Sequence, residues 1–165
     1  MAATVVWIID TSSIAQVRRS IANHRKGSVF DQMGRLVQEG RLAFPAQVVE
    51  ELERWADPAT PDQQFLWAKK YKADATQNQP TFEEVKEVLA EVPAVLDPDK
   101  DAGAEEADPY VLAMALHLRV LGRDARVVTE EVRDYPRKMS LNTAAGLVGV
   151  PSVNLMAFLG FEKIA

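Results

Sequence analysis

Residues 4–21 read TVVWIIDTSSIAQVRRSI, and this stretch decides the fold. Its first part, TVVWII, is short, rich in β-branched residues and almost entirely apolar, which is typical of a strand buried on both faces of a parallel sheet. The following DTSSI offers Asp, Thr and Ser as helix N-caps, and Ile14, Val17 and Ile21 then recur at helical spacing. Asp10 is therefore expected at the C-terminal end of a first strand, where open α/β sheets bind their ligands.

The rest of the chain alternates between helix and strand patterns. Further strands are predicted at RLAF (41–44), at ARVVTEE (125–131) and, as a last edge strand, at FEKIA (161–165). Helices are predicted at 29–40, 45–56, 63–75, 81–92 and 108–122, with two short ones within 140–161. This order predicts an α/β fold, a central parallel sheet with helices on both faces, in a single domain spanning residues 1–165.

Two of these helices carry acidic residues of interest. In PAQVVEELERWA (45–56), Pro45 takes a favoured first-turn position, and a buried stripe is predicted to include Leu52 and Trp55. DPYVLAMALHLRVLG (108–122) has Asp108 as a predicted N-cap and a glycine at its end. The acidic, proline-containing stretch before Asp108 is expected to be a loop.

Composition excludes several classes of protein. The chain has no cysteine, which rules out disulfides and thiol chemistry, and its two histidines are far apart. No apolar run is long enough for a membrane helix, and the N-terminus lacks the pattern of a signal peptide, so we expect a cytoplasmic protein with no membrane association. The net charge of -5 counts against simple nucleic-acid binding, but basic residues cluster around Arg18 and around Arg133. Either cluster is equally well interpreted as a solvated helix or loop face.

Four carboxylates fall at the boundaries between predicted elements. They are Asp10, Glu51, Asp108 and Glu131. Right-handed crossovers bring the ends of parallel strands to one edge, where such carboxylates would repel one another unless a hard cation such as Mg²⁺ or Mn²⁺ joined them. Such an ion could lower the pKa of a bound water and stabilise charge on a phosphate. Taken singly, the aspartates are as well explained as N-caps, and the glutamates are better explained as solvated helix or loop residues.

The motifs that carry these residues form a recognisable series. IIDTSSI (8–14), FPAQVVEEL (44–52), ADPYVLAMAL (107–116) and VVTEE (127–131) occur in the order and spacing of a known family. The chain resembles the PIN-domain ribonucleases, most closely the VapC-like toxins of type II toxin–antitoxin pairs. The resemblance implies a PIN-like fold and a catalytic metal site formed by Asp10, Glu51, Asp108 and Glu131. It also implies that Ser12 and Thr129 support the site by hydrogen bonding.

The sequence departs from the family pattern at some positions and leaves the choice of ligands and the number of ions open. Glu131 stands where the family often has Asp or Asn, and Glu130 beside it is an alternative ligand, as Glu50 is for Glu51. Whether one or two ions bind is also open. The helical segment 63–92 is longer than a minimal PIN toxin needs, and we interpret it as an insert that holds substrate or a partner.

These patterns favour one function over two rivals. The favoured hypothesis is a divalent-metal-dependent endoribonuclease that cleaves single-stranded RNA, with Arg18 and Arg133 holding the RNA backbone. As a toxin it would have a cognate antitoxin as partner, and a homodimer is possible. The first rival is a non-catalytic PIN-fold module that binds RNA or protein. The second, a phosphatase or nucleotide-binding domain, is disfavoured because no glycine-rich phosphate loop follows any predicted strand.

Overall fold

A four-stranded, all-parallel sheet forms the centre of the computed structural model, which describes residues 4–57, 59, 62–97 and 106–164. The strand order is β2-β1-β3-β4. The strands are β1 (Val5–Ile9), β2 (Leu42–Ala43), β3 (Asp124–Val128) and β4 (Ser152–Val153). The predicted mixed α/β fold with a central parallel sheet is confirmed, and it is consistent with the PIN-like expectation.

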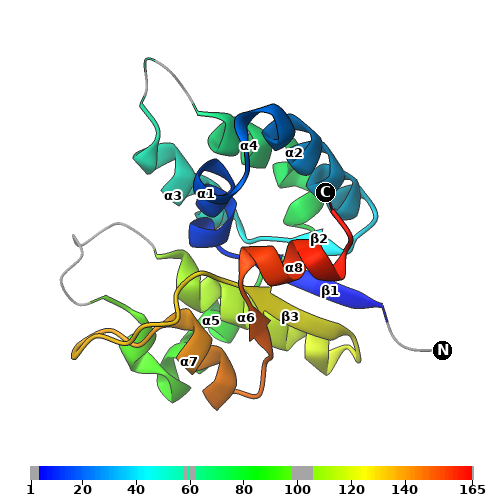
Figure 1. The fold of residues 1–165 in the computed structure, drawn as a ribbon. Coiled ribbons are helices and arrows are strands. Elements are labelled where there is room, and N and C mark those ends of the chain that lie inside the picture. Colours follow the sequence, from blue (N-terminus) through cyan, green and yellow to red (C-terminus); the bar gives the residue numbers. More distant parts are fainter. Residues whose placement is uncertain (1–3, 58, 60–61, 98–105, 165) are drawn as a thin grey trace.

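Helices flank the sheet on both sides (Figure 1). In that view α1 to α4 lie above the sheet and α5 to α7 below it, while α8 crosses in front. The first group is α1 (Thr11–Ser20), α2 (Asn23–Gln38), α3 (Ala46–Trp55) and α4 (Gln63–Ala75). The second is α5 (Phe82–Glu91), the short 3₁₀ helix η1 (Pro93–Val95), α6 (Ala107–Val120) and α7 (Leu141–Leu147), and α8 spans Leu155–Phe161.

The register of the two central strands brings their C-terminal ends level with each other. All five residues of β1 are buried, as a strand covered on both faces requires. Val5 pairs with Asp124 and Ile9 with Val128, so both strands end at the same edge of the sheet. Asp10 continues this alignment, since its backbone N–H donates to the carbonyl of Val128 at 3.0 Å. The segments that follow β1 and β3 therefore start side by side.

Two aromatic clusters fill parts of the core. Trp7 of β1 packs edge-on against Phe158 of α8, with ring centroids 5.3 Å apart. Elsewhere Trp67 of α4 packs on Phe30 of α2, and its indole N–H donates to the Phe30 carbonyl at 2.9 Å. Gly34 of α2 permits this packing of α2 on α4, because a Cβ there would come within 2.3 Å of the Tyr71 ring. Large apolar side chains thus fix α2 and α4 together above β2.

Three sequence-based expectations about elements are wrong. Residues 161–164 do not form an edge strand, because Phe161 ends α8 and the fourth strand is instead formed by Ser152 and Val153, which pair with β3. Trp55 is 57% exposed and outside the buried stripe, because it lies on the last turn of α3. Asp108 is not an N-cap, because α6 already begins at Ala107.

Parts of two predicted loops lie outside the described residues, namely residues 58, 60 and 61 of the turn after α3 and residues 98–105 of the acidic segment before α6. The helices α4 and α5 form within the predicted insert 63–92. Among the residues that the structure describes, no helix is both long enough and apolar enough to cross a membrane.

Candidate metal centre

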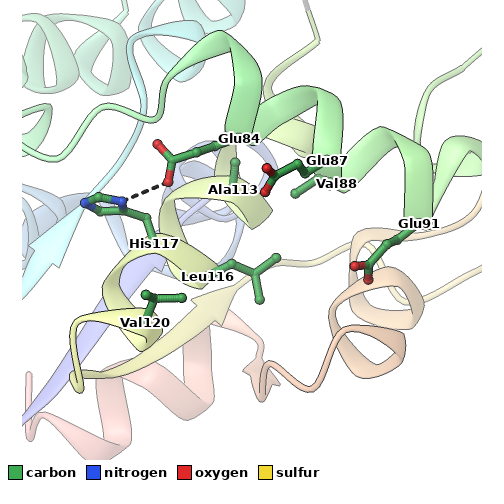
Figure 2. Close-up of a pocket in the computed structure, with 8 residues that line it drawn as sticks. All are labelled: Glu84, Glu87, Val88, Glu91, Ala113, Leu116, His117 and Val120. Atoms are coloured by element: carbon green, nitrogen blue, oxygen red, sulfur yellow. Dashed lines mark hydrogen bonds and ion pairs between the residues drawn. The ribbon is translucent and has the colours of Figure 1, made fainter.

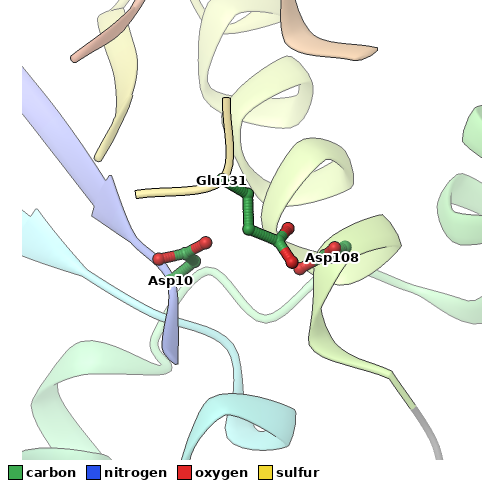
Figure 3. A group of neighbouring side chains, drawn as sticks. All are labelled: Asp10, Asp108 and Glu131. Atoms are coloured by element: carbon green, nitrogen blue, oxygen red, sulfur yellow. The ribbon is translucent and has the colours of Figure 1, made fainter. Parts of the chain in front are cut away.

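Three of the four predicted carboxylates converge at the C-terminal edge of the sheet. Asp10 follows β1, Asp108 lies in the first turn of α6, and Glu131 lies three residues beyond the end of β3. One carboxylate oxygen from each lies within 4.8 Å of those from the other two (Figure 3). Asp10 is buried, whereas Asp108 and Glu131 are partly exposed, so the group is open to solvent on one side.

Asp10 is held in place by hydrogen bonds to both of its carboxylate oxygens. Oδ1 accepts from the backbone N–H of Ser13 at 3.0 Å, the N-cap contact of α1, and from the Ser12 hydroxyl at 2.8 Å. Oδ2 accepts from the Thr129 hydroxyl at 2.6 Å. Asp10 is therefore a helix cap and a member of the carboxylate group at once, so the two sequence-based interpretations are compatible.

Ser12 and Thr129 also fix the segment that carries Glu131. The Ser12 hydroxyl accepts from the backbone N–H of Glu130 at 3.1 Å, and the Thr129 hydroxyl accepts from that of Glu131 at 3.0 Å. Each hydroxyl thus joins Asp10 to the chain after β3. This is the geometry expected of the supporting role predicted for Ser12 and Thr129.

Burial and repulsion by neighbouring carboxylates raise the pKa values of two of the carboxyl groups. Burial, with the charge of Asp108 as a second cause, raises the pKa of Asp10 to about 7, although the hydrogen bonds from Thr129 and Ser13 oppose this. Burial and the same neighbour raise the pKa of Glu131 to about 8. Among the residues described, Oε2 of Glu131 is buried without a hydrogen-bond partner. An unsatisfied buried carboxylate oxygen facing two other carboxylates is costly unless a proton or a cation occupies the site.

Lys138 supplies one positive charge to the group. Its ammonium donates to Oδ2 of Asp108 at 3.0 Å and to the backbone carbonyl of Met139 at 2.8 Å. Both side chains of the ion pair are largely buried. Sequence reasoning placed Lys138 in a basic cluster but missed this contact, because no spacing pattern links it to Asp108.

Glu51, the fourth predicted ligand, lines the small hollow that Asp10, Asp108 and Glu131 also line, but it lies outside the converging group. Its Oε1 accepts from the Thr11 hydroxyl at 2.9 Å and from the backbone N–H of Ala107 at 3.2 Å. Glu51 therefore ties α3 to the first residues of both α1 and α6, the helices that position Asp10 and Asp108. Its role as a metal ligand stays a prediction.

In each pair of neighbouring glutamates, the structure places one residue at the carboxylate hollow and the other away from it. Glu50 is exposed on α3, whereas Glu51 is buried in the hollow. The Glu130 carboxylate accepts from the Ser13 hydroxyl at 2.7 Å and from the backbone N–H of Leu155 at 2.9 Å, which directs it toward α8. Glu131 is thus the one placed toward the metal centre.

The remaining predicted residues lie at different distances from the centre. Arg18 is exposed near the end of α1 and lines a hollow next to the carboxylates. Arg133 is exposed on the loop after β3, where its guanidinium lies 5.5 Å from the centre of the Tyr135 ring. Sequence reasoning also missed Glu106, a buried residue of the carboxylate hollow whose side chain accepts from the backbone N–H of Asp97 at 2.9 Å.

The donor set fits a hard divalent cation. Three carboxylates on separate elements present oxygen atoms to a common point, and oxygen-only ligation is what Mg²⁺ and Mn²⁺ favour. Asp10, Asp108 and Glu131 would hold the ion. Its charge would satisfy the buried Oε2 of Glu131. It would also displace the protons that Asp10 and Glu131 retain because their pKa values are raised.

Comparison with known proteins places the chain in a family. A family model described as a domain of unknown function, DUF4411, matches residues 7–165. The chain belongs to the DUF4411 family. The match covers every residue of the metal centre, but its description names no activity, so the PIN-domain resemblance stays a prediction. No curated protein matches this DUF4411 chain.

Proposed function

We propose that this DUF4411 protein is a divalent-metal-dependent endoribonuclease that cleaves single-stranded RNA. The observation that carries the proposal is the convergence of Asp10, Asp108 and Glu131 at the C-terminal edge of the sheet. Structural ion pairs do not explain the group, because it contains three acidic side chains and only Lys138 as a cationic partner within hydrogen-bond distance among the residues described. Ligand sites of open α/β sheets lie at this edge.

The chain's own residues would orient the reaction. Mg²⁺ or Mn²⁺ bound by the carboxylates supplies an activated water and an electrostatic clamp on the phosphate. Asp10 is preoriented by Ser12 and Thr129, so little reorganisation is needed on binding. In hydrolysis the water would give up a proton as its oxygen forms a bond to phosphorus, the bond to the leaving ribose oxygen would break, and that oxygen would take up a proton. Lys138, beside Asp108, places a positive charge near the developing negative charge.

RNA as substrate and a toxin role are the finer parts of the proposal. The PIN-like motifs suggest both, and Arg18 beside the metal centre suggests a backbone contact. A toxin of this type requires a cognate antitoxin that covers the site. A small open reading frame adjacent to the gene, whose product binds the chain and blocks cleavage, would support that role.

A non-catalytic binding module is the second candidate function. The ion pair of Lys138 with Asp108 favours it, since an ammonium group already offsets one negative charge of the cluster without a metal ion. Protonation of Asp10 and Glu131 could offset the rest. Such a module would hold RNA or a protein but would have no need of tight Mn²⁺ binding.

Two measurements on the purified chain separate these candidates. Calorimetric titration with Mn²⁺ should show binding that Asp10→Asn and Asp108→Asn weaken, while Glu87→Gln on the surface of α5 leaves it unchanged. Incubation with a broad pool of single-stranded RNA should give cleavage that needs Mg²⁺ or Mn²⁺ and stops with chelator. A chain free of antitoxin that binds no divalent metal and cuts nothing in the pool would refute the nuclease.

A further inference from the structure

A trough extends from the metal centre along α1. The small carboxylate hollow, of about 60 Å³, shares Ser12 and Trp55 with a larger hollow of about 630 Å³. That hollow shares Arg18 and Gln64 with a third, of about 350 Å³, that reaches α2. We call the large middle hollow the α1 trough; its lining includes Ser12, Gln16, Arg18, Arg19, Trp55 and Gln64. Its volume lies within the about 300–1,000 Å³ typical of sites that take a small organic molecule, so a nucleotide unit fits.

Trp55 stands where the trough meets the metal centre and lines both hollows. It is 57% exposed, whereas Trp7 and Trp67, the other two tryptophans of the chain, are buried. Both buried indoles donate a hydrogen bond, Trp7 to Glu162 and Trp67 to the Phe30 carbonyl. In the part of the chain that the structure describes, neither a hydrogen bond nor a ring contact engages the Trp55 side chain. Its ring is therefore available to stack on a ligand.

The part of the trough that α1 lines is cationic. Arg18 and Arg19 form the exposed last turn of α1, and within the described ranges neither makes an ion pair. Asp62 is the one acidic residue of this hollow among those described, and its Oδ1 accepts from the backbone N–H of Phe65 as the N-cap of α4. Although the whole chain carries a net charge of -5, this surface is thus locally positive.

An exposed indole beside free guanidinium groups suits one class of ligand. Unpaired bases stack on aromatic side chains while cationic groups track the phosphates, which is how proteins hold single strands without reading sequence. A duplex keeps its bases stacked on one another and cannot offer one to Trp55. A free anion would use the arginines but not the indole.

We infer that the α1 trough binds one flank of a single-stranded RNA, with a base stacked on Trp55 next to the scissile phosphate and the backbone held by Arg18 and Arg19. This inference rests on the proposed function for the position of the scissile phosphate. It adds the path of the strand and makes Trp55 a substrate-positioning residue.

Tryptophan fluorescence tests the inference without cleavage. In an Asp10→Asn background with chelator present, so that the RNA stays intact, a single-stranded RNA of about ten nucleotides should quench the emission, because only Trp55 among the three tryptophans is accessible. Trp55→Phe should abolish the quenching yet keep most of the affinity, since phenylalanine also stacks. An abasic strand of equal length and a duplex should each quench far less.

Affinity measurements with matched controls give the second readout. Trp55→Leu should weaken RNA binding by about 5- to 150-fold, the loss that corresponds to one stacked base. Phe82→Leu, an equally exposed aromatic residue on α5, should leave affinity within a factor of about two. Arg18→Gln and Arg19→Gln should each flatten the salt dependence by about 0.7 in log–log slope, whereas Arg123→Gln, before β3 at the opposite edge of the sheet, should not.

The outcomes separate this inference from the proposed function. Quenching that Trp55→Phe abolishes, together with the affinity loss in Trp55→Leu, supports the trough even if the chain cuts no RNA, in which case only the nuclease proposal fails. Metal-dependent cleavage with no quenching and an unchanged affinity of Trp55→Leu overturns the trough and leaves the nuclease standing. Failure to bind single-stranded RNA at all overturns it too.

Discussion

The protein presents two groups of acidic side chains in hollows, and the pKa shifts of Asp10 and Glu131 in one are opposite in direction to that of Glu84 in the other. The first is the candidate metal centre of Asp10, Asp108 and Glu131. The second lines a groove of about 290 Å³ between α5 and α6, where Glu84, Glu87 and Glu91 lie along α5 and face α6 (Figure 2). The three glutamates of the groove come from one helix, whereas the three carboxylates of the centre come from three separate elements.

The shifted pKa values in the two groups differ in direction, as this difference in origin predicts. The pKa of Glu84 is lowered, first by the backbone N–H of Thr81 in the capping box and also by His117, whose Nδ1 lies 2.8 Å from Oε2 of Glu84. The pKa values of Asp10 and Glu131 are raised by burial and by Asp108. On the solvated helix α5, Glu84 finds partners of its own in Thr81 and His117, whereas carboxylates forced together by the fold keep a deficit of positive charge.

The largest expected effect of this difference is on RNA cleavage. Asp10→Asn should lower the rate by more than the about 10- to 100-fold that loss of an outer-shell partner typically costs, because it removes a direct ligand. Glu87→Gln, in the groove, should leave the rate unchanged. Single-turnover assays on one RNA measure both. An equal loss of cleavage rate in Asp10→Asn and Glu87→Gln would contradict the assignment of the catalytic centre to Asp10, Asp108 and Glu131.

The next effect is the pH dependence of metal binding. Because protons must leave Asp10 and Glu131 before a cation binds, Mn²⁺ affinity should rise with pH up to about 8, by up to about tenfold per unit for each proton released. Glu131→Gln should remove part of that slope, and Glu84→Gln should not alter it. Calorimetry in buffers of different ionisation enthalpy counts the released protons. A flat profile would show that the carboxyls are already ionised without metal.

Metal-free stability should show opposite signs in the two groups. The raised pKa of Glu131 means that its protonation favours the folded state; this contribution is complete below the unfolded value of 4.5 and is lost as pH rises through about 8. Glu131→Gln should therefore stabilise the chain at pH 9 by on the order of 2 kcal/mol, a value discounted from the full shift because solvent reaches part of the side chain.

Glu84 is the matched control, because its lowered pKa contributes stability that is present above 4.5 and lost as pH falls. Glu84→Gln should cost up to about 1 kcal/mol at neutral pH and nothing in strong acid. Urea denaturation in the presence of chelator, at several pH values, measures both variants. Parallel pH profiles of stability for Glu131→Gln and Glu84→Gln would show that Asp10 and Asp108 do not raise the pKa of Glu131.

The same contrast explains what the sequence predicts well and what it does not. The buried β1 strand and the capped helix after it were predicted from local patterns. Strand ends of a parallel sheet meet at one edge, so Asp10 and Glu131 could be expected together, and Asp108 joins them from the start of α6, the helix that leads into β3. The ion pair of Lys138 depends on the path of the loop after β3. The exposure of Trp55 depends on what packs beside the last turn of α3, and helical periodicity does not report it.

The smallest expected effect concerns Lys138, the cation that the centre already holds. Its ammonium lies 3.0 Å from Oδ2 of Asp108, where it would compete with a divalent ion. Lys138→Met keeps the apolar stem and removes the charge, so Mn²⁺ affinity should rise by about two- to five-fold, the size of a typical single ion pair. The titration belongs above pH 8, since without Lys138 the pKa of Glu131 would rise further and mask the gain at neutral pH. His117→Leu removes the imidazole partner of Glu84 in the α5–α6 groove and should leave Mn²⁺ affinity unchanged. A fall in affinity in Lys138→Met would instead mean that the ammonium orients Asp108 for the ion, and that the centre needs this contact to form.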